Sequence, residues 1–296
     1  MSNKKGDSSD LKSELSFFLR LLNQALEWPP LRRLIWKYWY EYLARKFQVN
    51  EFTFMNYGFF DESIECLQLE DSDEPNRNLL GLYHQLTEGI LFEGKTVLEV
   101  GSGRGGGASY IARYFKPGIV MGMDRSKNAI SLCRKIHSNS SLEFIQGDAE
   151  YLPFENNKFD IIFNVESSHC YGSMKLFLSE VHRALKPGGF FLYTDFRPHA
   201  AMAEMATLLT SVGFDLLVER EITSNVLMAL DRESARKEHL IELHSPKVLK
   251  NILGEFAAIR GSKIYNCFKD GSLVYKSFQL QKAKQFTSAN QPVAAL

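Results

Sequence analysis

Short apolar runs alternate with amphipathic segments from residue 78 onward, and this alternation restricts the fold more than any other feature of the chain. Apolar runs of strand length bounded by turn residues predict strands, and helical spacing in the segments between them predicts helices. Their succession predicts an α/β fold, a doubly wound and mostly parallel seven-stranded sheet with helices on both faces. The expected strands are TVLEV, IVMGMD, LEFIQGD, FDIIFNVES, FFLYTDF, DLLVEREI and LVYKSFQLQK.

We expect the chain to have three parts. Residues 1–77 form an N-terminal tail and helical cap ending in the polar linker EDSDEPNR, and residues 78–222 form the ligand-binding core. Residues 223–296 contribute inserted helices, the last strand and a C-terminal tail, and the helices of the outer parts are expected to roof the site. Residues 31–47 combine aromatic and basic side chains, which fits either a helix that covers a pocket or one that lies on a membrane surface. The neutral charge of the whole chain favours the first.

Composition excludes several classes of protein. The 296 residues include 35 basic and 35 acidic ones, so the chain lacks the basic excess of a nucleic-acid-binding protein. The four cysteines are far apart and have no metal-ligand spacing, which predicts reduced thiols in a cytoplasmic protein without a metal. No apolar run reaches the roughly 18–20 residues of a membrane-spanning helix. Composition does not indicate an oligomeric state.

The segment VLEVGSGRGGG, residues 97–107, places five glycines directly after the first expected strand. Gly101, Gly103 and Gly106 match the pattern G-x-G-x-x-G, which by itself also fits a dinucleotide site or a tight turn without a ligand. Such loops bind a diphosphate through amide donors, and the carboxylate of Glu99 adds unfavourable negative charge there. A cationic ligand removes this conflict. S-adenosylmethionine carries a sulfonium and an ammonium and no phosphate, so it suits the loop better than NAD.

Two aspartates follow the next strands of the expected sheet. Asp124 ends the second strand, where a carboxylate accepts hydrogen bonds from ribose hydroxyls. Asp148 follows the third strand and could accept from an adenine amino group, while Ala149 offers a backbone donor. Each aspartate alone also fits a helix cap or a turn. Their positions at successive strand ends favour a nucleoside site.

Several segments in the same order resemble the signature of class I S-adenosylmethionine-dependent methyltransferases: VLEVGSGRGGG, GDAEYLPFENNKFDII and ALKPGGFF. The similarity covers roughly residues 78–222. MNYGFF, VESSHCY and YTDFRP further resemble bacterial small-molecule O-methyltransferases of the phthiotriolone/phenolphthiodiolone dimycocerosate type. The resemblance implies a Rossmann-like fold, S-adenosyl-L-methionine as cofactor, and methyl transfer to a hydroxyl of a lipid, polyketide or related small molecule.

The same resemblance assigns roles to three more residues. His169 follows the fourth expected strand and is implied as general base, and Asp195, at the end of the fifth, is implied to orient its ring. The alternative is that His169 only caps the strand end or shapes the pocket. Tyr57 is implied to fold over the cofactor and donate to its methionine carboxylate, whereas plain packing under the N-terminal helices is equally compatible with the sequence.

Other activities remain as alternatives. Methyl transfer to carbon or nitrogen of a sterol, quinone or other small molecule uses the same fold, and a non-catalytic scaffold could retain it. A scaffold is less expected because the glycine loop, both aspartates and the His169–Asp195 pair are all present. The many aromatic residues in 17–60 favour a bulky, apolar acceptor.

Overall fold

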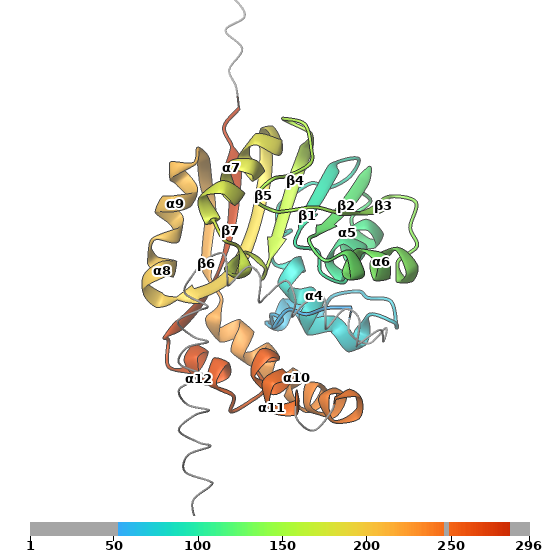
Figure 1. The fold of residues 1–296 in the computed structure, drawn as a ribbon, viewed down its shortest axis with the longest axis vertical. Coiled ribbons are helices and arrows are strands. Elements are labelled where there is room, and N and C mark those ends of the chain that lie inside the picture. Colours follow the sequence, from blue (N-terminus) through green and yellow to red (C-terminus); the bar gives the residue numbers. More distant parts are fainter. Residues whose placement is uncertain (1–52, 246–248, 285–296) are drawn as a thin grey trace, which may run out of the picture.

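The computed structural model describes residues 53–245 and 249–284 (Figure 1). The helices expected within residues 11–47, including the segment 31–47, lie outside the described residues.

Seven strands form one mixed sheet in the order β3-β2-β1-β4-β5-β7-β6. The pairs among β1 to β5 are parallel, and only β7 runs antiparallel to its neighbours β5 and β6. The prediction of a doubly wound, mostly parallel seven-stranded sheet is confirmed. The strands are β1 (Thr96–Val100), β2 (Ile119–Asp124), β3 (Leu142–Gln146), β4 (Phe159–Val165), β5 (Leu185–Pro198), β6 (Phe214–Glu221) and β7 (Leu273–Lys282).

Helices cover both faces of the sheet, because β1, β4 and β5 are buried on both sides and need an apolar layer on each. On one face, α4 (Arg77–His84), α5 (Gly106–Tyr114) and α6 (Lys127–Ile136) contribute to one core cluster. On the other, α7 (Met174–Ala184), α8 (His199–Ala203) and α9 (Met205–Ser211) contribute to a second. The described residues also include three short helical turns: α3 (Glu62–Glu65), η2 (Glu74–Asn76) and η3 (Ser168–Cys170).

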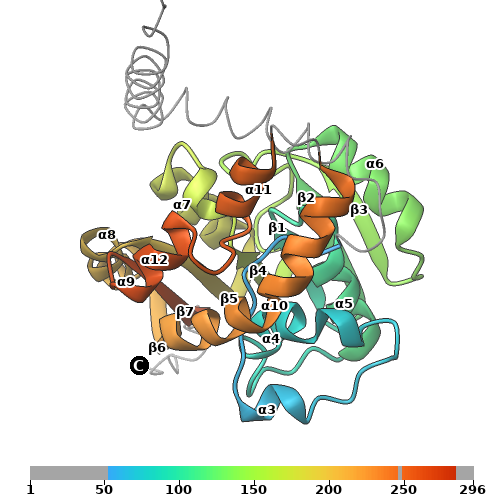
Figure 2. The same cartoon turned by 90° about the horizontal axis from the view of Figure 1, so that it is seen from below.

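The sequence predicts inserted helices before the last strand, and the described residues between β6 and β7 include α10 (Thr223–His244), α11 (Lys250–Phe256) and α12 (Lys263–Lys269). They lie together beyond the edge of the sheet where β1 and β4 end, and α10 passes beneath the sheet beside α4 (Figures 1 and 2). Asn78 Nδ2 of α4 donates to Glu233 Oε1 of α10 at 2.8 Å, which ties the insertion to the core.

One predicted boundary is wrong. The sequence ALKPGG suggests that the helix before the fifth strand stops at glycine, but α7 ends at Ala184. Leu185 already pairs with Phe159 of β4, and Gly188 and Gly189 lie within β5, so sheet pairing overrides the helical pattern. Within the described part of the chain, no helix has the length and apolar character needed to cross a membrane.

Candidate active site

The glycine loop joins β1 to α5 and exposes its backbone to a cavity. Gly101, Gly103 and Gly105 have φ of 76°, 52° and 78°, a left-handed conformation that glycine adopts without steric cost. A Cβ at Gly101 would lie 2.7 Å from Ser167 Cβ and 2.9 Å from Tyr171 Oη. The loop therefore needs glycine both for its conformation and for its close approach to the segment after β4.

The loop forms one wall of a cavity at the carboxyl ends of the strands, the first cavity. Its other walls come from the ends of β2, β3 and β4, so the topology brings together residues that are far apart in sequence. The expected cofactor residues among its lining are Gly101, Gly103, Asp124, Asp148 and Ala149, and Glu166, Ser167 and Cys170 line it from the segment after β4.

The two aspartates are oriented by backbone amides. Asp124 Oδ2 accepts from Gly103 N–H at 2.9 Å, and its Oδ1 accepts from Ser126 N–H at 2.8 Å. Asp148 Oδ1 accepts from Glu150 N–H at 3.1 Å. Carboxylates beside an open glycine backbone suit hydroxyl groups, an amino group and a cation, and they repel a diphosphate. The cavity thus fits S-adenosyl-L-methionine, although each residue's contact with it stays a prediction.

Glu99 lies behind the glycine loop and is not among the residues that line the first cavity. It is 2% exposed, and Tyr83 Oη donates to its Oε1 at 2.7 Å. Its Oε2 has no hydrogen-bond partner among the described residues. Burial raises the pKa of Glu99 to about 8, against the opposing hydrogen bonds from Tyr83 and the Ala108 amide. The position under the loop suits a charge that acts on a nearby cation, but direct contact with the ligand stays a prediction.

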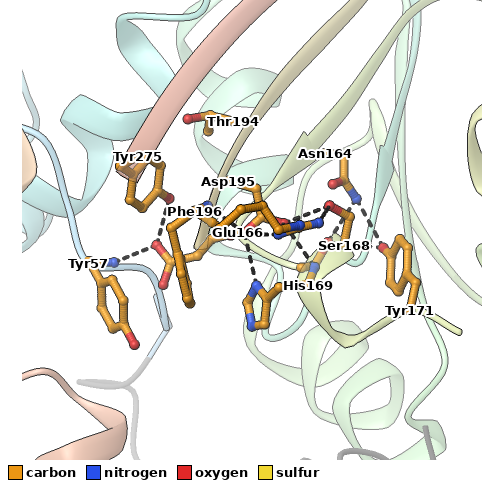
Figure 3. A network of polar contacts seen from close by, with 12 residues as sticks. Tyr57, Asn164, Glu166, Ser168, His169, Tyr171, Thr194, Asp195, Phe196 and Tyr275 are labelled. Carbon is orange, nitrogen blue, oxygen red and sulfur yellow. Dashed lines mark hydrogen bonds and ion pairs between the residues drawn. The ribbon is translucent and has the colours of Figure 1, made fainter. Parts of the chain in front are cut away.

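His169 and Asp195 form a hydrogen-bonded pair, with Nδ1 and Oδ1 2.9 Å apart (Figure 3). They meet because β4 and β5 are parallel neighbours and both residues lie at the carboxyl ends. Asp195 is fully buried, and its Oδ2 also accepts from Ser168 Oγ at 2.6 Å and contacts the Arg197 guanidinium at 3.1 Å. Although burial opposes ionisation, Arg197 and His169 hold the pKa of Asp195 well below its usual range. Asp195 is therefore a permanent carboxylate.

The environment of His169 favours its protonated form. Burial alone lowers the pKa of His169, but Cys170 and Asp195 outweigh this and raise it to about 10. The imidazole is thus a strong base that is mostly protonated at neutral pH. Its side chain is 16% exposed, and the next residue, Cys170, lines the first cavity.

Tyr57 lies away from the glycine loop. Its hydroxyl donates to Phe256 O at 3.3 Å, and its ring stacks on Phe196 with centroids 5.5 Å apart. It lines a second cavity, bounded by residues 54–57, α10 and α11, and is not part of the lining of the first. The predicted bond to a cofactor carboxylate is untested, and the structure supplies a protein partner for that hydroxyl.

Glu166 is a candidate site residue that the sequence reasoning missed. The residue lines the first cavity, and its Oε2 accepts from Tyr57 N–H at 2.9 Å and from Tyr275 Oη at 2.8 Å (Figure 3). Its φ of 48° is left-handed, which is strained for a residue with a Cβ and concentrates at functional sites. Burial raises its pKa to about 7. The acid directly before Ser-Ser-His in VESSHCY was the available signal.

The sheet order, the glycine loop and the carboxylates at successive strand ends define the class I methyltransferase architecture. A protein-family model described as "Methyltransferase domain" matches residues 98–193. The phthiotriol/phenolphthiotriol dimycocerosates methyltransferase of Mycobacterium tuberculosis H37Rv is 38% identical over 248 residues, covering 84% of this chain and 92% of the relative. The fatty-acid O-methyltransferase of Mycolicibacterium smegmatis is 37% identical over 239 residues, 81% of this chain and 86% of that protein.

Among solved structures, a putative sarcosine dimethylglycine methyltransferase from Galdieria sulphuraria superposes with a TM-score of 0.64 over 77% of this chain and 93% of that one, at 14% identity. At that identity the likeness shows the fold alone. The sequence relatives therefore carry the family assignment, and the structural likeness agrees with it in fold. The chain belongs to the family of S-adenosyl-L-methionine-dependent methyltransferases that includes the phthiotriol/phenolphthiotriol dimycocerosates methyltransferases.

Proposed function

We propose that this methyltransferase acts on an oxygen of an apolar, lipid-like acceptor, with His169 as general base and Asp195 as its orienting carboxylate. The observation that carries the proposal is the 2.9 Å contact between His169 Nδ1 and Asp195 Oδ1 at the carboxyl edge, beside the first cavity. The named substrates of the relatives, a phthiotriol dimycocerosate and a fatty acid, support acceptors of this class.

The first cavity holds the methyl donor in this proposal. The backbone of Gly101 and Gly103 lies against its methionine part, Asp124 accepts from its ribose, and Asp148 and Ala149 recognise its adenine. When bound, S-adenosyl-L-methionine supplies an activated methyl group on a positively charged sulfur. Above its pKa of about 8, the ionised Glu99 contributes negative potential from beneath the loop. The core of residues 78–222 thus binds the donor.

With a hydroxyl acceptor, His169 removes the proton of the acceptor oxygen. Asp195 holds Nδ1, and we assign proton uptake to Nε2 on the far side of the ring (Figure 3). The imidazolium that forms lies against a buried carboxylate that stays ionised, so the developing positive charge is stabilised. Alignment of the oxygen with the methyl group supplies the remaining acceleration.

The outer parts of the chain form the acceptor side. The helices α10, α11 and α12 lie beyond the carboxyl edge (Figure 1), where they cover the reacting groups and exclude water. A small-molecule acceptor in the cytoplasm fits this arrangement.

Two measurements test the proposal. Isothermal titration must show binding of S-adenosyl-L-methionine, and NAD must not compete. Turnover with long-chain alcohols, phenols and fatty acids, followed by mass spectrometry of the products, must give methyl ethers or esters. Products methylated at carbon or nitrogen would replace the oxygen assignment, and absence of turnover with intact donor binding would favour a scaffold.

A further inference from the structure

The second cavity lies next to the first and is lined mainly by apolar side chains. Phe54, Met55 and Asn56 line both cavities, so a molecule in the second reaches toward the first along this segment. Its remaining walls come from Leu79 of α4, from Arg104 of the glycine loop, which also lines the first cavity, and from the inserted helices α10 and α11 with the residues that directly follow them. The apolar members of the lining are Leu79, Leu240, Ile241, Leu253, Phe256 and Ala257.

Lys237 of α10 is a cation in this apolar setting. Its Nζ donates to Ala257 O at 3.2 Å and lies 5.6 Å from the centroid of the Tyr57 ring. Across residues 53–245 and 249–284, no carboxylate oxygen forms an ion pair with this Nζ. An ammonium in an apolar environment without a counter-ion is unfavourable unless a ligand supplies one.

The nearby carboxylates are engaged elsewhere. Glu233 Oε2 pairs with Arg236 at 2.7 Å, and its Oε1 accepts from Asn78. Glu166 accepts from the Tyr57 amide and from Tyr275. These contacts leave the Lys237 ammonium without a carboxylate contact within residues 53–245 and 249–284, whereas Arg236, the other cation that α10 contributes to this cavity, pairs with Glu233. Burial accordingly lowers the pKa of Lys237 to about 8, although Glu233 and Glu166 oppose the shift.

We propose that Lys237 is a specificity-determining residue for acceptors that carry a carboxylate on an apolar body. The second cavity takes the apolar body, and the Lys237 ammonium binds the carboxylate and so fixes the direction in which the acceptor enters. This inference rests on the proposed function, because it assigns the second cavity to the methyl acceptor. It adds a charge requirement that the apolar lining alone does not impose.

The test compares two probes with the same chain, decanoate and 1-decanol, by isothermal titration at pH 7 with S-adenosylhomocysteine present. The wild-type protein is expected to bind decanoate at least tenfold more tightly than 1-decanol. Lys237→Met should reduce this preference to within twofold while leaving the affinity for 1-decanol nearly unchanged, and Lys237→Arg should retain the preference.

Lys250→Met is the matched control, because Lys250 lies on α11, pairs with Glu242 and is not part of the cavity lining. It should retain the wild-type preference. Lys237→Gln replaces the methionine variant if that protein does not fold. A wild-type protein without preference for decanoate, or a Lys237→Met protein that keeps it, overturns the inference. Titration of S-adenosylhomocysteine alone distinguishes failure of this inference from failure of the proposed function. If the proposed function is wrong, neither the wild-type protein nor any variant binds S-adenosylhomocysteine.

Discussion

The backbone N–H of Tyr57 donates to Glu166 Oε2 at 2.9 Å, and this bond joins residues 109 positions apart in the chain. Glu166 lines the first cavity and Tyr57 lines the second, so the bond lies between the two cavities. Tyr275 Oη donates to the same carboxylate oxygen from β7. Glu166 thereby positions the segment that separates the two cavities.

Substitution of Glu166 separates backbone strain from side-chain function. Glu166→Gly and Glu166→Ala both remove the carboxylate that accepts from the Tyr57 amide and should raise the acceptor KM several-fold. At φ 48° alanine keeps the strain that glycine relieves, so the glycine variant should have the higher free energy of unfolding, by about 1 kcal/mol in urea denaturation.

Lys116 offers the control for this comparison, because it has the same φ of 48° in an exposed turn. Its glycine and alanine variants should show the same order of stability and wild-type kinetics. Equal stability of Glu166→Gly and Glu166→Ala would show that the left-handed conformation relaxes.

Gly101→Ala should abolish donor binding. The added Cβ would lie 2.7 Å from Ser167 Cβ, and φ is 76°, so the loop must move away from the cavity. Gly261→Ala is the matched control, since its φ is 86° and no atom lies within 4 Å of the added Cβ. Both variants should lose about 1 kcal/mol of unfolding free energy through strain, but only Gly101→Ala should lose affinity for S-adenosylhomocysteine in titration calorimetry. Equal affinities in the two variants would contradict the loop assignment.

His169→Ala should lower kcat by about 10²- to 10⁴-fold, the usual contribution of a general base. Donor affinity should stay within about threefold, because the side chain is not part of the first-cavity lining. The control is His182→Ala on α7, whose ring packs on Phe214 on the opposite face of the sheet and should not affect turnover. Unchanged kcat in His169→Ala removes the residue from the proposed role.

The pH profile of kcat/KM should report the His169 pKa. With a hydroxyl acceptor the neutral imidazole is the active form, so activity should rise with pH, with its midpoint near pH 10 and its plateau above that. Asp195→Asn removes a negative charge that raises this pKa, so the rise should move to lower pH while the maximum rate falls. A profile that is flat from pH 7 to 10 in the wild-type protein would exclude titration of His169 from the reaction.

Titration of His169 should affect stability in the opposite direction, so that the free energy of unfolding falls as pH rises. His169 binds its proton more tightly in the folded state than in the unfolded chain, where its pKa is about 6.5. Its contribution to the free energy of unfolding is therefore fully present below about pH 6.5 and is lost as pH rises through about 10. Urea unfolding at pH 6, 8 and 10 should show this decline, and His169→Ala should weaken it. A decline of equal size in both proteins would assign it to other groups.

The sequence predicts those features that follow from strand order. Asp124 is the last residue of β2, and Asp148 and His169 lie in the segments that follow β3 and β4, so the parallel pairing of β1 to β4 brings all three to one edge. Asp195 meets His169 for the same reason, one strand further.

The remaining features depend on contacts that strand periodicity does not encode. The sequence places Glu99 at the loop, yet its burial behind Tyr83 depends on the packing of α4. Tyr57 contacts Phe256, 199 positions away, and Lys237 reaches the second cavity from an inserted helix. The left-handed φ of Glu166 follows from the closure of the chain between β4 and η3, and a glutamate there carries no local signal for it.

Glu99→Gln tests whether the acid beneath the loop acts on the donor's positive charge. With a pKa of about 8, Glu99 is mostly protonated at pH 6 and mostly ionised at pH 9. The ratio of wild-type to variant donor affinity should therefore be near 1 at pH 6 and grow toward pH 9. The donor's own titration affects both proteins equally, so the ratio isolates Glu99.

Stability provides the control, because Gln can still accept the Tyr83 hydrogen bond. The folded-state pKa of Glu99 lies above its unfolded value, so the wild-type carboxyl stabilises the fold most at low pH and loses this contribution as pH rises through about 8. In urea unfolding, the free energy of unfolding of Glu99→Gln should therefore increase relative to that of the wild-type protein between pH 5 and pH 9. An affinity ratio that does not change with pH, alongside this gain in stability, would mean that Glu99 supports the loop without sensing the ligand's charge.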